Sequence, residues 1–230
     1  MTKKLPKHIG IIMDGNRRWA QQKGLPTLKG HWAGYQVMKK IGQWCLDRGI
    51  KYLTVWAFST ENWKRSKKEV DYLMSLLRRA LREEVEVFHK KGVRLNVLGR
   101  IEGLPKELQK EVYWAIEKTK KNTKAIFNLA INYGGRAEIV DVVKKIMNKG
   151  LKATKINESL IAKYLYSPSL PEPDLVIRTS GELRTSGFLL WESAYSELYF
   201  SKKYWPDFSE KDLDEAIEDY QKRERRFGGG

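Results

Sequence analysis

The fold is decided first at residues 8–20, His8-Ile9-Gly10-Ile11-Ile12-Met13-Asp14-Gly15-Asn16-Arg17-Arg18-Trp19-Ala20. The apolar run at residues 9–13 predicts a buried strand, and the polar turn that follows predicts the start of a helix. Gly15 would let the backbone approach a ligand closely, and Arg17 and Arg18 would add positive charge. The stretch therefore predicts a phosphate cradle. A simple helix cap by Asp14 is the competing interpretation.

Further apolar runs, rich in β-branched and aromatic residues, predict strands at residues 52–58, 93–98, 125–131 and 175–177. Helical periodicity lies between them, clearest at residues 69–91, and further helices are predicted at 105–121, after Gly134 as far as Lys149, and at 210–221. This alternation predicts an α/β fold, a mostly parallel sheet covered by helices, in a single domain over residues 1–230.

The composition suits a folded protein, with 41% hydrophobic and 31% charged residues in 230. The net charge of +16 allows nucleic acid, an anionic membrane surface or diphosphates as partners. A single cysteine, Cys45, excludes an internal disulfide, and no apolar run reaches the length of a membrane span. We therefore expect a cytoplasmic protein, with peripheral contact at the inner face of the membrane as a further option.

Polar residues gather directly after two more of the predicted strands. In parallel sheets ligands bind beyond the carboxyl ends of the strands, so these segments are predicted to meet at one edge. Arginine among hydroxyl groups suits the bidentate binding of phosphate oxygens. The candidates are Ser59, Thr60, Glu61, Asn62, Trp63 and Arg65 after the second strand, and Arg178, Arg184, Thr185 and Ser186 after the fifth.

Diphosphates commonly bind together with magnesium, which prefers oxygen ligands and needs only one or two carboxylates. The candidate ligands are Asp14 and Glu197, and an ion pair with an arginine is the alternative role for Glu197. His31 is a further candidate, predicted to lie in a glycine-flanked turn after the first short helix. His8 is expected to be a satisfied structural histidine.

The order of these motifs resembles the cis-prenyltransferase family, of the undecaprenyl diphosphate synthase type. The resemblance spans nearly the whole chain and rests on residues 8–20, Gly30-His31 with Gly34, residues 57–63 with Arg65, 132–136, 174–178, 188–191, 205–208 and 223–229. It implies a sheet covered by helices, with a hydrophobic tunnel beside the helix at residues 69–91 and a medium-length, undecaprenyl-like polyprenyl diphosphate as the product.

The resemblance also implies roles for the candidate residues. Gly15, Asn16, Arg17, Arg18 and Trp19 would bind the allylic diphosphate with His31 and Arg65, while Arg178, Arg184, Thr185 and Ser186 would hold isopentenyl diphosphate. Asn62, with Ser59, Thr60, Glu61 and Trp63 around it, would lie near the departing proton, and Asp14 and Glu197 would hold Mg²⁺. Family members are homodimers, whose tail, here Arg226-Phe227-Gly228, reaches the partner's site.

The sequence departs from the family pattern at Thr27, Leu183 and Gly187, which puts one phosphate contact and any metal ligation by residue 183 in doubt.

Three alternative functions were weighed against this resemblance. A nucleic-acid-binding protein is disfavoured because basic and aromatic residues cluster at strand ends instead of along a groove. A partner subunit without catalysis is disfavoured because the substrate-binding residues are present. A synthase of shorter or longer products remains open.

Overall fold

The computed structural model describes residues 5–223, and six parallel strands form one sheet in the order β3-β4-β2-β1-β5-β6. The strands are β1 (His8–Ile12), β2 (Tyr52–Ser59), β3 (Val93–Leu98), β4 (Ala125–Tyr133), β5 (Leu175–Arg178) and β6 (Glu197–Phe200). The first five match the predicted runs to within two residues at each end. The sequence analysis did not predict β6, a four-residue edge strand that is only half-buried.

Five helices confirm the predicted ones, whereas α2 and α6 were not predicted from the sequence. They are α1 (Asn16–Gln22), α2 (Thr27–Asp47), α3 (Lys67–Lys90), α4 (Lys106–Thr119), α5 (Gly135–Asn148), α6 (Glu158–Tyr164) and α7 (Glu210–Lys222). In α2 the structure contradicts the expected turn around His31, which lies inside the helix. The glycines that suggested a turn have a packing role: a Cβ at Gly30 would lie 2.0 Å from the Asn16 carbonyl oxygen, so they let α1 and α2 approach closely.

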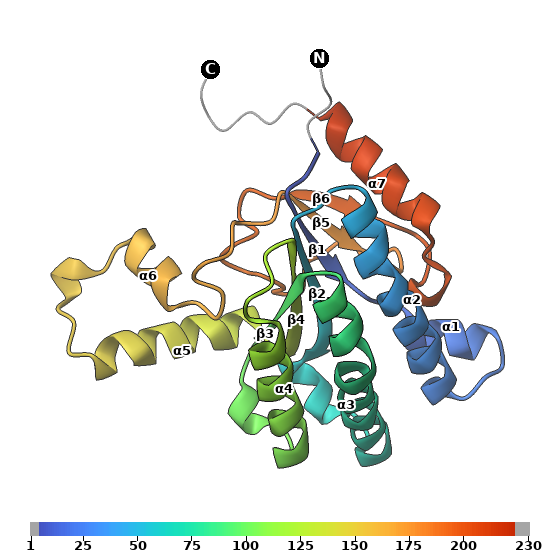
Figure 1. Cartoon of the computed structure of the whole chain (residues 1–230), viewed down its shortest axis with the longest axis horizontal. Coiled ribbons are helices and arrows are strands. Elements are labelled where there is room, and N and C mark those ends of the chain that lie inside the picture. The colour runs from blue at the N-terminus through green and yellow to red at the C-terminus, as the bar shows by residue number, and fades with distance from the viewer. Residues whose placement is uncertain (1–4, 224–230) are drawn as a thin grey trace.

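Side chains alternate between the two faces of the sheet, as expected for strands buried on both sides. Ile9 and Ile11 point into the large core beneath α2, α3, α4 and α7, while Ile12 packs on the opposite face with Val176 and Phe188. Figure 1 shows those four helices on one side of the sheet, with α5 and α6 extending away as an arm. The single layer of strands covered by helices confirms the predicted fold class.

Register brings the ends of three strands together. Ile12 of β1 pairs with Trp56 of β2 on one side and with Arg178 of β5 on the other. The chain passes from β1 to β2 on one flank and returns later to β5 on the other, so the strand order changes direction at β1. Ligands bind at such a point in open parallel sheets.

Candidate active site

The turn after β1 has a backbone that only glycine tolerates. Gly15 has φ 105°, and a Cβ there would lie 2.7 Å from the ring of Tyr204. The turn is tied to the end of β5, because the Asp14 backbone N–H donates to Thr179 Oγ1 at 2.9 Å. Two predicted segments therefore meet as expected.

The Asp14 side chain lies among arginines instead of capping α1. Its Oδ2 is 2.9 Å from Arg178 Nη2 and 3.3 Å from Arg18 Nη2, and the cap position of α1 belongs to Gly15. Burial raises the pKa of Asp14, but the hydrogen bond and charge of Arg178, with Ser180 and Arg18, outweigh it and hold the pKa below its usual value. The helix-cap interpretation is wrong, and this carboxylate is ionised at neutral pH.

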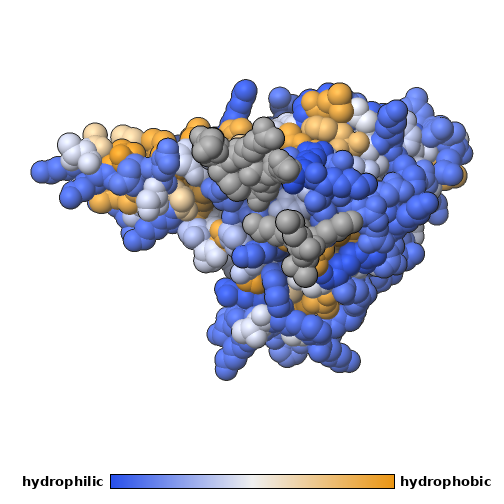
Figure 2. All heavy atoms as spheres, turned by 90° about the horizontal axis from the view of Figure 1, so that it is seen from above, coloured by the Kyte–Doolittle hydropathy of each residue, from blue (hydrophilic) through white to orange (hydrophobic). Residues whose placement is uncertain are grey.

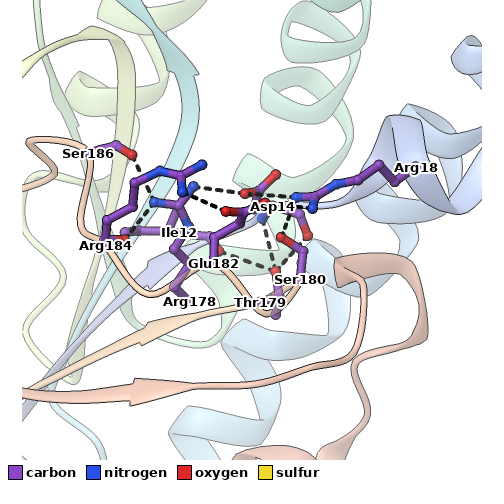
Figure 3. Close-up of polar contacts among 9 residues, drawn as sticks. All are labelled: Ile12, Asp14, Arg18, Arg178, Thr179, Ser180, Glu182, Arg184 and Ser186. Atoms are coloured by element: carbon purple, nitrogen blue, oxygen red, sulfur yellow. Dashed lines mark hydrogen bonds and ion pairs between the residues drawn. The ribbon is translucent and has the colours of Figure 1, made fainter.

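The loop after β5 encloses Arg178 (Figure 3). Its guanidinium, 7% exposed, donates through Nη1 to Ser186 Oγ at 2.8 Å and to the Arg184 carbonyl at 2.5 Å. Ser180 and Ser186 have positive φ values of 79° and 52°. Strain of this kind in non-glycine residues persists where surrounding contacts impose it and concentrates at functional sites. The loop is thus fixed around one buried cation.

Arg184 and Arg18 lie at the outer edge of the same loop. Arg184, 61% exposed, pairs with Glu182 at 2.6 Å, and Arg18 contacts Glu182 at 2.8 Å and Ser180 Oγ at 2.6 Å. Exposed pairs of this kind contribute little stability and exchange readily with a ligand. Both arginines are therefore available to an anion, whereas Arg178 is fixed in place.

After β2 comes a short 3-10 helix (Thr60–Lys64), and Ser59 is its N-cap. The Ser59 backbone N–H donates to Asn62 Oδ1 at 3.1 Å. Because this partner is a donor, the amide oxygen must face it, and the NH₂ group of Asn62 is left as a donor. Trp63 donates to Asn132 Oδ1 at 2.7 Å. The geometry therefore makes Asn62 a hydrogen-bond donor rather than a base.

A cavity of about 730 Å³ runs from this edge of the sheet into the space between α2 and α3. Its mouth is polar, lined by Asp14, Gly15, Asn16, Arg17, Arg18, His31, Ser59, Glu61, Asn62, Arg65, Arg178 and Ser186, all predicted from the sequence. Its inner part is largely apolar, lined by Tyr35, Met38, Leu73, Leu76, Leu77 and Ala80. Of the predicted substrate-binding residues, Trp19, Thr60, Trp63, Arg184 and Thr185 lie outside the lining.

Comparisons with known proteins agree with this geometry. A family profile described as "Putative undecaprenyl diphosphate synthase" matches residues 12–228. The chain belongs to the undecaprenyl diphosphate synthase family. It is 52% identical to an isoprenyl transferase of Thermotoga maritima, over 98% of both chains. It is 50% identical to a geranylgeranyl-diphosphate-specific tritrans,polycis-undecaprenyl-diphosphate synthase of Pyrococcus furiosus, over 97% of this chain and 87% of that one.

Among solved structures, lavandulyl diphosphate synthase from Lavandula x intermedia, in complex with dimethylallyl diphosphate, matches with a TM-score of 0.94 and 37% identity. The match covers 98% of this chain and 99% of that one. Family membership makes the protein a prenyltransferase and confirms the resemblance drawn from the motifs.

In this member of the undecaprenyl diphosphate synthase family, a residue not selected from the sequence lies behind the mouth. Glu69, in the first turn of α3, is 2.9 Å from His31 Nε2 and 3.0 Å from Arg65 Nη1. Its position three residues after the cap Ser66 is typical of an ordinary helix start, which concealed it. The available signal was that Glu69 directly precedes the apolar stripe that begins at Val70.

The predicted pairing of Asp14 with Glu197 around one metal ion does not occur within a chain. Glu197 begins β6 level with Leu175, at the amino end of the parallel strands, whereas Asp14 follows the carboxyl end of β1. Its carboxylate is 2.8 Å from Arg223 Nη1, so the alternative of an arginine ion pair is confirmed. Among residues 5–223, no group of three or more His, Cys, Asp or Glu could hold a metal.

Three further expectations concern other parts of the chain. His8 is a satisfied histidine, since Nε2 lies 2.7 Å from Thr54 Oγ1 and Nδ1 lies 2.7 Å from the Pro171 carbonyl. Arg226, Phe227 and Gly228 lie outside the described residues. Within residues 5–223 we find no helix with the length and hydrophobicity to cross a membrane.

Proposed function

We propose that this prenyltransferase is a single catalytic domain that condenses isopentenyl diphosphate units onto an allylic prenyl diphosphate, making a medium-length polyprenyl diphosphate. The observation that carries the proposal is one cavity with a cationic mouth and an apolar interior between α2 and α3. Such a cavity suits a substrate with a charged head and a growing hydrocarbon chain, because apolar surface is buried while the diphosphate stays among hydrogen-bond donors.

Two groups of basic side chains flank Asp14 and support the proposal of two diphosphate sites. Arg17, His31 and Arg65 lie toward α2 and α3, on the side where the apolar interior begins, which suits the allylic substrate with its hydrocarbon tail. On the other side, Arg178 and Ser186, with Arg184 at the edge, suit isopentenyl diphosphate. Trp19, Thr60, Trp63 and Thr185 lie outside the cavity lining.

In the reaction, the allylic C–O bond breaks and diphosphate leaves, the isopentenyl double bond forms the new C–C bond, and a proton departs to create the cis double bond. Arg18 and Arg65 stabilise the leaving charge. The lowered pKa of Asp14 makes it a poor base, so we assign the departing proton to a diphosphate oxygen that Asn62 orients through its NH₂ group.

Magnesium fits the mouth at Asp14. The Asp14 side chain is 29% exposed beside the cations that would bind diphosphate, and one carboxylate together with phosphate oxygens is a sufficient ligand set. Bound there, the ion would supply positive charge for the leaving group. Because Glu197 of the same chain is at the other end of the sheet, it is not a ligand in this arrangement.

We further propose a homodimer that uses the arm formed by α5 and α6. Val140 and Val143 are each 49% exposed and Met147 is 71% exposed, at a spacing that places them on one face of α5. Figure 2 shows hydrophobic residues along this projecting arm. A face of this kind is typical of a subunit contact. Met147→Glu should shift the protein toward monomer in sedimentation, whereas an unchanged dimer would place the contact elsewhere.

The proposed activity is tested by incubating the purified protein with isopentenyl diphosphate and allylic primers of different lengths, with and without magnesium. We expect magnesium-dependent elongation to products of undecaprenyl length. Products of only one or two added units, or of dolichol length, would contradict the assigned length. Absence of any elongation with every primer would contradict the function itself.

The tail motif at residues 226–228 is tested in the same assay. Deleting residues 226–230 and mixing that protein with Arg178→Ala should partly restore activity, because some mixed dimers would pair an intact tail with an intact Arg178 site. No recovery despite demonstrated subunit exchange would contradict sharing between subunits.

A further inference from the structure

We propose that Glu69 is a positioning residue that holds three side chains of the allylic site, Arg17, His31 and Arg65, in one arrangement before substrate arrives. The inference rests on the proposed function for the identity of the ligand. The geometry rests on the structure alone and concerns a carboxylate that acts through its neighbours.

One oxygen of Glu69 collects groups from three separate elements. Oε1 is 2.9 Å from His31 Nε2 on α2, 3.0 Å from Arg65 Nη1 ahead of α3, and 3.9 Å from Arg17 Nε on α1. All three partners line the cavity mouth, whereas Glu69 does not line it and is 8% exposed. Its carboxylate therefore lies behind the binding surface and fixes the side chains that form it.

The contact also decides which nitrogen of His31 carries a proton. An ionised carboxylate only accepts hydrogen bonds, so Nε2 must be the protonated nitrogen. In the neutral ring Nδ1 is then an acceptor, and it becomes a donor to a phosphate oxygen only when His31 takes up a second proton. Glu69 thus sets the orientation in which the imidazole meets an anion.

The charges that face His31 act in opposite directions. Burial lowers the pKa of His31, and the charges of Arg65 and Arg17 lower it further, while the hydrogen bond and charge of Glu69 raise it. Burial raises the pKa of Glu69, but His31, Arg65 and Arg17 outweigh it and keep the carboxylate ionised. Glu69 is therefore the counterion that lets two arginines and an imidazole lie together without a ligand.

The test is Glu69→Gln, which keeps the side-chain size and an acceptor oxygen but removes the charge. We expect kcat/KM for the allylic diphosphate to fall by about tenfold to a hundredfold, as for a misplaced binding group, with the KM for isopentenyl diphosphate changed less than about twofold. The pKa of His31, measured by NMR on a chain with three histidines, should fall in the variant.

Two other variants keep the test decisive. Arg17→Gln, at a side chain that is 60% exposed, should fold normally and move the pKa of His31 upward, because it removes a charge of like sign. Glu84→Gln is the matched control, since Glu84 lies on the same helix with similar burial but pairs with Lys39. It should lose similar stability and leave the pKa of His31 unchanged.

Glu69→Asp, which restores the charge at a shorter reach, should return the pKa of His31 part of the way toward its original value. An unchanged pKa of His31 in Glu69→Gln, or equal changes in Glu69→Gln and Glu84→Gln, would overturn the inference. The NMR measurement does not depend on turnover and can be repeated with inorganic diphosphate. If the pKa of His31 shifts in Glu69→Gln but the original protein elongates no primer, the missing elongation refutes the proposed function, and the pKa shift leaves this inference standing.

Discussion

Two glutamates, Glu69 and Glu192, are equally buried, each 8% exposed, yet their surroundings differ. Glu69 faces an imidazole and two guanidinium groups, and its pKa is lowered. Glu192 accepts a hydrogen bond from Ser167 Oγ at 3.0 Å, while its Oε2 is buried and has no hydrogen-bond partner among residues 5–223. Burial, reinforced by the negative charge of Glu138, raises the pKa of Glu192 to about 7.

The difference teaches that burial sets the cost of a charge, whereas the partners decide whether the charge is kept. At the cavity mouth, carboxylates and arginines compensate one another and remain ionised, so an arriving diphosphate meets cations already in place. In the first turn of α5, Glu138 accepts from the Tyr133 hydroxyl at 2.6 Å and from the Tyr166 backbone N–H at 2.8 Å. There the carboxyl groups accept hydrogen bonds from neighbouring structural groups, and protonation of Glu192 should stabilise the fold.

The largest effect is expected at the charged mouth. Asp14→Ala should reduce turnover by about a thousandfold or more, because it removes the carboxylate between the two groups of cations and the ligand assigned to magnesium. Steady-state kinetics measure the loss, and circular dichroism checks the fold. Asp71→Ala, which removes an exposed carboxylate paired with Lys67, is the control. Turnover within about tenfold of the original would refute the assignment of Asp14.

The next effect separates fixed from exposed arginines. Arg178→Ala should raise the KM for isopentenyl diphosphate by the equivalent of about 1.5 to 3 kcal/mol, the range for charge-assisted hydrogen bonds. Arg184→Ala should raise it less, because that side chain is 61% exposed and its pairing is screened by water. Equal KM values for the two variants would show that burial of Arg178 does not matter for binding.

A smaller effect is expected in stability at Glu192. A carboxyl whose pKa is raised on folding binds more protons in the folded state, so the free energy of unfolding should fall as pH rises from about 5 through 7. Glu192→Gln, which removes the charge, should stabilise the protein at pH 8 by about 1 to 3 kcal/mol and much less at pH 5. Urea unfolding at both pH values measures this. A variant equally stable or less stable at pH 8 would contradict the unpaired-charge explanation.

The smallest effect concerns the helix start that carries Glu69. Ser66 Oγ accepts from the Glu69 backbone N–H at 3.4 Å, and Ser66→Ala should cost about 0.5 to 1 kcal/mol of stability. Asn157→Ala removes the cap of α6, where Oδ1 accepts from the Leu160 N–H at 2.9 Å, at a comparable cost. Thermal unfolding should show both losses, and only Ser66→Ala should also lower kcat/KM. Equal kinetics in the two variants would mean that the cap does not support the site.

The sequence by itself determined the features that depend on neighbours along the chain. Apolar runs predicted five of the strands, helical spacing predicted α3 and α4, and the turn after β1 predicted a phosphate cradle at a strand end. The polar residues of the cavity mouth were predicted as well, because parallel strands bring their carboxyl ends to one edge and polar segments follow those ends directly.

Only the tertiary structure decided the features that depend on contacts between distant segments. It placed His31 inside α2, because Gly30 and Gly34 accommodate Asn16 of α1 and do not form a turn. It put Glu197 at the amino end of edge strand β6, facing Arg223, and made Glu69 the common partner of three cavity residues. A carboxylate has the same chemistry wherever it occurs in a sequence, and the charges packed around it set its pKa and its role.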